Sequence, residues 1–262
     1  MALLVLSGCK WRLMPDDIDK ADGGVVVERY DRIQSLYLTT GDFSALQQLN
    51  TQYPMQTRAL IEDVLKIGRV NDPEINSKFL KFFQDIALQS LINEVEQQYA
   101  NMDDINKELA SAFDKLKKEV PGIEVPQVYS QIGALDQSIV VGNNTVGISL
   151  DKYLGEDYPL YLKYYPKSQR EQMVRSMIVP DCVLFYLLSL YPMPHGGSQP
   201  QVECDIHMGK IMWVVNKLVG RQVFDGEYVS LVSKYMKKHK SGTVAWLLSD
   251  DNYSAIAAMG GK

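Results

Sequence analysis

The sequence has few of the residues on which common active sites and metal sites depend. It contains 3 cysteines and 3 histidines in 262 residues, which excludes a disulfide scaffold and a zinc-ribbon framework. The formal net charge of −5 argues against a nucleic-acid binder, because such proteins need a basic surface. A run of about 18 apolar residues, which would predict a transmembrane helix, does not occur. A glycine-rich phosphate loop, a dinucleotide fingerprint and a serine nucleophile elbow are also missing.

The first nine residues resemble the lipobox of bacterial lipoproteins. A short apolar run ends in Leu6-Ser7-Gly8-Cys9. In that motif a peptidase cuts before the cysteine, whose thiol carries a diacylglycerol. The resemblance implies a signal peptide over residues 1–8, truncated at its start because no basic residue precedes Leu3, then a tether over residues 9–24. The alternative is a buried N-terminal strand.

Lipidation of Cys9 implies a location in the cell envelope. Two or three acyl chains on one residue anchor a protein durably in a membrane. No acidic cluster follows Cys9 directly, and in lipoproteins of Bacteroidota such a cluster marks export to the cell surface. We therefore expect an outer-membrane anchor that faces the periplasm.

Residues 25–262 predict a single globular domain of the α+β class. Apolar residues at three- and four-residue spacings predict a helical half over 28–120, with helix N-caps at Asp42 and Asp103. In the second half, 121–250, alternating and β-branched residues predict about three strands, and further helices follow. The predicted strands are 125–132, 138–141 and 145–150, and the predicted later helices are 181–191, 203–219 and 226–240.

Two sets of residues are weak candidates for special chemistry. Glu203 and His207 lie four residues apart and share a helix face, and with Asp181 they are the candidates for a metal site, although standard zinc spacing is missing. Cys182 and Cys204 lie near the facing ends of two predicted helices. They form either a disulfide, which an oxidising periplasm permits, or two independent buried thiols.

Tyrosines are concentrated among charged residues in the segment 152–166. Tyr153, Tyr158, Tyr161 and Tyr164 are the candidates for a partner-binding patch. The alternative is a helix or loop that covers the core.

The segment from about residue 126 to 248 resembles the gliding-motility lipoprotein B (GldB-like) family of Bacteroidota. The most specific part is the Gly-Ile-x-Leu-Asp-x-Tyr-Leu-Gly run over 147–155. The resemblance also rests on 125–129, 144–146, 178–181, 209–212 and Trp246. The lipobox and the helical N-terminal half fit the same family, whose members are typically longer at the C-terminus.

The family layout is in turn similar to the zincin fold of zinc metallopeptidases. In a zincin, two histidines on one helix bind zinc and a glutamate between them activates water. The segment in the place of that helix, 179–191, contains neither histidine nor glutamate, and Met208 stands where the family pattern has an acidic residue. The resemblance therefore implies a degenerate, non-catalytic zincin-like layout with no cofactor.

Three functions compete at this point. The first is a non-enzymatic, membrane-anchored lipoprotein that binds other envelope proteins, related to gliding or envelope machinery, with no nucleic-acid partner. The second is a metal-dependent, peptidase-like hydrolase with atypical ligands drawn from Asp151, Asp181, Glu203 and His207. The third is a small-molecule or glycan-binding module with a concave aromatic site.

Overall fold

The computed structural model describes residues 24–194 and 200–260. These residues form many helices around a small sheet, which confirms the predicted α+β class. One cluster of buried apolar side chains extends from Val27 to Ile256 and includes residues from both halves of the chain. The signal peptide, Cys9 and most of the tether lie outside the described residues.

The first half of the described chain is helical, as predicted, except for a two-residue strand at its start. That strand is β1 (Val27–Glu28). The helices are α1 (Tyr30–Thr40), α2 (Phe43–Thr51), α3 (Pro54–Arg58), the π-helix η1 (Ala59–Val64), α4 (Ile75–Phe82), α5 (Ile86–Gln98) and α6 (Asp103–Glu119). Asp42 caps α2 by accepting a hydrogen bond from the Ala45 N–H. The predicted cap at Asp103 is wrong, because Asp103 is already in the first turn of α6.

The three predicted strands form, and β1 joins them in a four-stranded mixed sheet of order β1-β2-β4-β3. The strands are β2 (Gln127–Gln131), β3 (Ile139–Gly142) and β4 (Thr145–Ser149). β2 lies parallel to β1 and β4, whereas β3 pairs antiparallel with β4 across the predicted Gly-Asn-Asn turn. Asn144 has a φ of 54° there, a left-handed conformation that asparagine tolerates well.

The helices after the sheet are more numerous than predicted. They are η2 (Leu150–Lys152), α7 (Pro159–Tyr164), α8 (Lys167–Arg170), η3 (Arg175–Met177), α9 (Ile178–Leu190), α10 (Gln201–Val219), α11 (Glu227–Lys238), α12 (Val244–Ser249), α13 (Tyr253–Ala257) and η5 (Ala258–Gly260). α9, α10 and α11 correspond to the three predicted helices. Within the described residues, no helix has the length and apolar character needed to cross a bilayer.

Buried polar side chains on α1 fix the carboxyl end of β2. The side-chain amide of Gln34 donates to the Ile132 carbonyl and accepts from the Ile132 N–H, both at 2.8 Å. The Ser130 hydroxyl donates to Asp31, whose carboxylate also receives two hydrogen bonds from Arg29. Because buried polar groups need partners, these contacts fix the position of α1 on the sheet.

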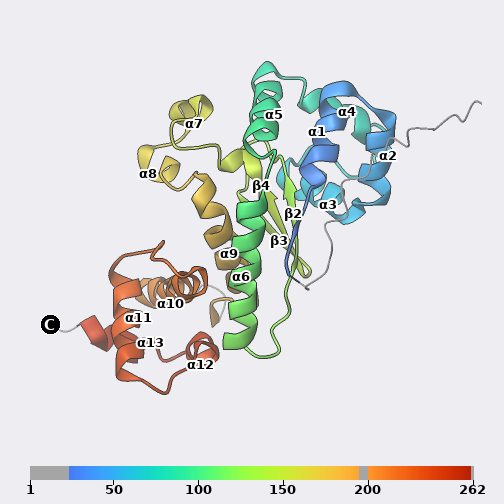
Figure 1. The fold of residues 1–262 in the computed structure, drawn as a ribbon. Coiled ribbons are helices and arrows are strands. Elements are labelled where there is room, and N and C mark those ends of the chain that lie inside the picture. Colours follow the sequence, from blue (N-terminus) through green and yellow to red (C-terminus); the bar gives the residue numbers. More distant parts are fainter. Residues whose placement is uncertain (1–23, 195–199, 261–262) are drawn as a thin grey trace, which may run out of the picture.

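The helices divide between two sides of the sheet (Figure 1). α1 to α4 lie on the right of the sheet in this view, α5 stands at the top above α6, α10 to α13 gather at the lower left, and α6 runs along the middle. α6 packs against α9 and α10, and α9 packs against β3 and β4.

The close approach of α10 and α11 depends on Gly209. A Cβ atom at this position would lie 2.8 Å from the Tyr228 Cβ and 2.9 Å from its carbonyl carbon. Those distances are shorter than van der Waals contact, so the two helices would have to move apart.

We predict that Gly209→Ala destabilises the protein by about 1–3 kcal/mol, as overpacking does. The sign is opposite to the gain of up to ~1 kcal/mol that alanine gives over glycine in an exposed helix. Urea unfolding measures the difference. Ser230→Ala, at an exposed position on α11, is the control and should change stability by less than about 0.5 kcal/mol. A Gly209→Ala protein as stable as the parent would contradict the steric argument.

Candidate partner-binding groove

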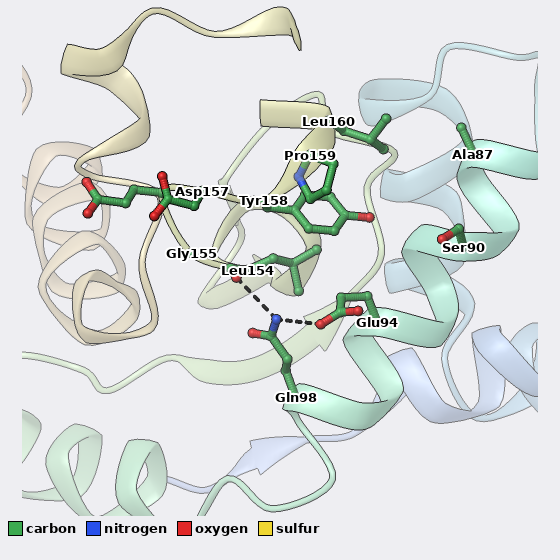
Figure 2. A pocket seen from close by; sticks show the side chains of 11 residues that line it. Ala87, Ser90, Glu94, Gln98, Leu154, Gly155, Asp157, Tyr158, Pro159 and Leu160 are labelled. Carbon is green, nitrogen blue, oxygen red and sulfur yellow. Dashed lines mark hydrogen bonds between the residues drawn. The ribbon is translucent and has the colours of Figure 1, made fainter. Parts of the chain in front are cut away.

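A groove of about 550 Å³ runs between α5 and the segment that leads from η2 into α7 (Figure 2). Its lining residues are Ala87, Ser90, Glu94 and Gln98 on one wall and the consecutive residues Leu154, Gly155, Glu156, Asp157, Tyr158, Pro159 and Leu160 on the other. The groove therefore joins two parts of the chain that lie about 60 residues apart in sequence.

One wall of the groove is a single face of α5. Its four lining residues follow one another at spacings of three and four, so their side chains lie in one row along the helix. Leu91, Ile92 and Val95 face the core on another side of α5 and are fully buried. Asp85 caps the helix by accepting hydrogen bonds from the N–H groups of Ala87 and Leu88. This wall is held in place because another face of its helix is packed into the core.

The other wall is held by tyrosine side chains beneath it. The Tyr161 hydroxyl accepts a hydrogen bond from the Leu154 N–H at 3.0 Å and donates one to the Asp151 carbonyl. The Tyr161 ring makes edge-to-face contacts with Tyr158 and Tyr165. The next residue of the wall, Gly155, donates its N–H to the Met173 carbonyl and has a φ of 108°, a region that favours glycine.

The buried carboxylate of Asp151 fixes the start of this wall. It accepts hydrogen bonds from the Gly133 N–H at 2.7 Å and the Leu135 N–H at 2.6 Å. Burial raises the pKa of Asp151, and the two backbone hydrogen bonds oppose that shift. Leu135 has a φ of 65°, a strained conformation that persists because the surrounding contacts hold it.

Gln98 connects the two walls. Its side-chain amide donates to the Glu94 carboxylate at 2.7 Å and to the Leu154 carbonyl at 3.2 Å, as Figure 2 shows. The Tyr158 ring lies across the groove with its hydroxyl toward α5. Burial, and then the nearby Glu94 carboxylate, raises the pKa of Tyr158. Ser90, Glu94 and Tyr158 thus bring polar atoms to a groove that is also lined by the apolar side chains of Leu154, Pro159 and Leu160.

The predicted tyrosine patch requires correction. Tyr153 and Tyr161 are buried, and their hydroxyls donate hydrogen bonds to groups inside the protein. They support the wall and are not on the surface. Tyr158 is half-buried and lines the groove, and Tyr164 is 60% exposed on α7. The sequence therefore located a segment that forms one wall of the groove, and of the four candidate tyrosines only Tyr158 lines it.

The weak metal candidates take part in structural hydrogen bonds. Asp181 accepts a hydrogen bond from the Tyr153 hydroxyl at 2.8 Å. The His207 ring nitrogens lie 3.2 Å from the Tyr253 hydroxyl and 2.9 Å from the Tyr191 carbonyl. Glu203 lies one turn before His207 on α10, as predicted. Over residues 24–194 and 200–260, no three His, Cys, Asp or Glu side chains gather closely enough to hold a metal ion.

A buried lysine that the sequence pattern did not predict lies near His207 on α10. Lys210 is fully buried on α10, its ammonium donates to the Asp250 carbonyl, and it lies 5.1 Å from the centre of the Tyr253 ring. Burial lowers the pKa of Lys210. Lys210 follows His207 by three residues, so the two side chains lie on one face of α10. This spacing was the one feature of the sequence that could have indicated that they are neighbours.

The two cysteines of the predicted pair are separate thiols in the structure. Cys182 is buried on α9, and Cys204 is half-buried on α10. Of the two alternatives that the sequence left open, the structure contains the independent thiols and not the disulfide. Burial raises the pKa of the Cys182 thiol, which keeps it protonated and unreactive.

The geometry is that of an α+β protein with a preformed lateral groove, and a comparison of sequences assigns its family. The family model described as gliding motility protein GldB matches residues 13–223. The chain therefore belongs to the GldB family, a family of gliding-motility lipoproteins. Neither a curated protein nor a solved structure matches the chain, so the zincin-like layout stays a prediction. The match extends through the helical half and ends before Trp246, which the resemblance had included.

The buried carboxyl group of Asp181 makes the stability of the folded protein depend on pH. Burial raises its pKa to about 6, and the hydrogen bond from Tyr153 opposes that shift. An unfolded aspartate titrates near ~3.9, so the folded state binds more protons between these two values. The contribution of this group to stability is therefore fully present below pH ~4 and is lost as pH rises through about 6.

We expect Asp181→Asn to remove this loss, so that its stability relative to the parent rises by about 2 kcal/mol between pH 4 and pH 7. The asparagine oxygen can still accept the Tyr153 hydrogen bond. Urea unfolding at both pH values measures the effect, with Asp114→Asn on the exposed side of α6 as the control. If Asp181→Asn and the parent lose the same stability between the two pH values, the assignment is wrong.

Proposed function

We propose that this protein is a membrane-anchored lipoprotein of the cell envelope that binds a partner protein in the groove between α5 and residues 154–160, without catalysis. The groove carries the proposal, because it is preformed and combines apolar walls with converging polar groups, as binding sites usually do. Membership of the GldB family relates the role to gliding or envelope machinery.

The anchor rests on the lipobox. Leu6-Ser7-Gly8-Cys9 places the lipid-bearing cysteine at the start of a tether over residues 9–24, ahead of the folded domain. Several acyl chains on one residue hold a protein durably in a membrane. With no acidic cluster directly after Cys9, we propose the periplasmic face of the outer membrane.

The structural roles of the candidate ligands support a non-catalytic function. Both ring nitrogens of His207 have partners, and the Asp181 carboxylate is engaged by Tyr153. A general base or metal ligand drawn from these groups would first have to give up those bonds. The alternative, a metal-dependent hydrolase, predicts a stoichiometric transition metal in protein purified without chelators, lost in His207→Ala, and elemental analysis tests it.

We predict that Cys9→Ala moves the protein from the membrane fraction to the soluble fraction, because the acyl chains supply the anchor. Fractionation of the native host and intact-mass measurement of the lipid adduct check this. Cys204→Ala, which changes a half-buried cysteine of α10, is the control and should stay in the membrane fraction with its adduct. Membrane retention of Cys9→Ala would contradict lipid anchoring at this residue.

We predict that a photo-crosslinking residue at Ser90, inside the groove, forms a discrete adduct in the native envelope. The same residue at Asn93, which is exposed on α5 but outside the groove lining, should not. Leu160→Ser, which removes apolar surface from the opposite wall, should weaken the Ser90 adduct. Equal adducts at both positions, or none at Ser90, would overturn the proposed binding site.

A further inference from the structure

The charge of the groove indicates which kind of side chain it binds. This inference rests on the proposed function of the groove as a partner-binding site. The lining residues include three acidic residues, Glu94, Glu156 and Asp157, and no lysine or arginine among the described residues. Of these, Glu94 projects from α5, whereas the Asp157 side chain points away from α5 (Figure 2). The remaining surface is formed largely by Leu154, Tyr158 and neighbouring apolar groups. A groove that combines apolar surface with the carboxylate of Glu94 is complementary to a long side chain that ends in a positive charge.

The positions of the side chains fit such an occupant. Glu94 projects from α5, and its carboxylate receives a hydrogen bond from Gln98. The Tyr158 ring lies across the groove opposite α5, and Leu154 lies beside it (Figure 2). The methylenes of a lysine or arginine can lie along these apolar surfaces while the charged end stays near the carboxylate. The face of a tyrosine ring also attracts cations.

We propose that the groove binds a lysine or arginine side chain of an extended segment of the partner protein. The Glu94 carboxylate accepts the charge-assisted hydrogen bond, and the Tyr158 ring and Leu154 contact the methylenes. The Glu94 carboxylate disfavours phosphate and carboxylate groups, so an anionic lipid headgroup or an acidic peptide is not the occupant. The nearby Arg170 is not one of the lining residues, and its guanidinium donates to the Glu156 carbonyl.

Two peptides that differ by one charge test the proposal on the whole protein. The probe is acetyl-Gly-Leu-Lys-Leu-Gly-amide, and its counterpart carries Nε-acetyl-lysine, which keeps the methylenes but removes the charge. NMR titration should show shifts at Ser90, Glu94 and residues 154–160 with the first peptide. The acetylated peptide should bind about tenfold more weakly, as loss of a charge-assisted hydrogen bond predicts.

Glu94→Gln should weaken binding of the lysine peptide by about the same factor, because the amide keeps the shape but not the charge. Glu74→Gln, at an exposed position on another part of the surface, makes the same change in net charge and should leave binding unchanged. Equal binding of both peptides, binding of neither, or shifts outside the groove would overturn the cationic occupant. If the cationic occupant is overturned but the Ser90 adduct forms in the envelope, the proposed function still holds. If the Ser90 adduct does not form, both the proposed function and the cationic occupant are overturned.

Discussion

Buried Asp151 holds together the segments on which one wall of the groove depends. It binds the N–H groups of Gly133 and Leu135 in the β2–β3 connection, and the Asp151 carbonyl accepts a hydrogen bond from Tyr161 on α7. A buried carboxylate without such partners would cost several kcal/mol. The end of β4, the β2–β3 connection and α7 therefore meet at one residue, and the groove wall begins shortly after it, at Leu154.

The two walls differ in construction but are both fixed before a partner arrives. α5 is held by its buried face and its cap, and the opposite segment is held by Tyr161 and by the Gly155 hydrogen bond to Met173. Gln98 then joins them. A preformed site loses less conformational entropy on binding, which suits a protein whose proposed function is recognition and not chemistry.

The sequence pattern predicted the helices and strands whose formation depends on neighbouring residues in the chain. The three strands follow from β-branched residues and the Gly-Asn-Asn turn, and α9 to α11 follow from apolar spacing. β1 was missed because two residues carry no periodicity and pair with β2 about 100 residues later. The tyrosine segment was found, but not the burial of Tyr153, whose hydroxyl donates to Asp181, 28 residues away. Spacing reveals which residues share a face, and only packing reveals which face is covered.

The difference between spacing and packing also decides whether Glu203 and His207 are suited to bind a metal. Their spacing is that of a ligand pair, but Lys210 lies buried on the same face of α10. Burial lowers the pKa of His207 and the charge of Lys210 adds to that shift, although the hydrogen bond to the Tyr191 carbonyl opposes it. Surroundings that disfavour a proton on this imidazole also disfavour a divalent cation beside it. Glu94 is in the opposite situation, because it lies on the wall of an open groove where a cationic group can reach it without displacing a buried positive charge.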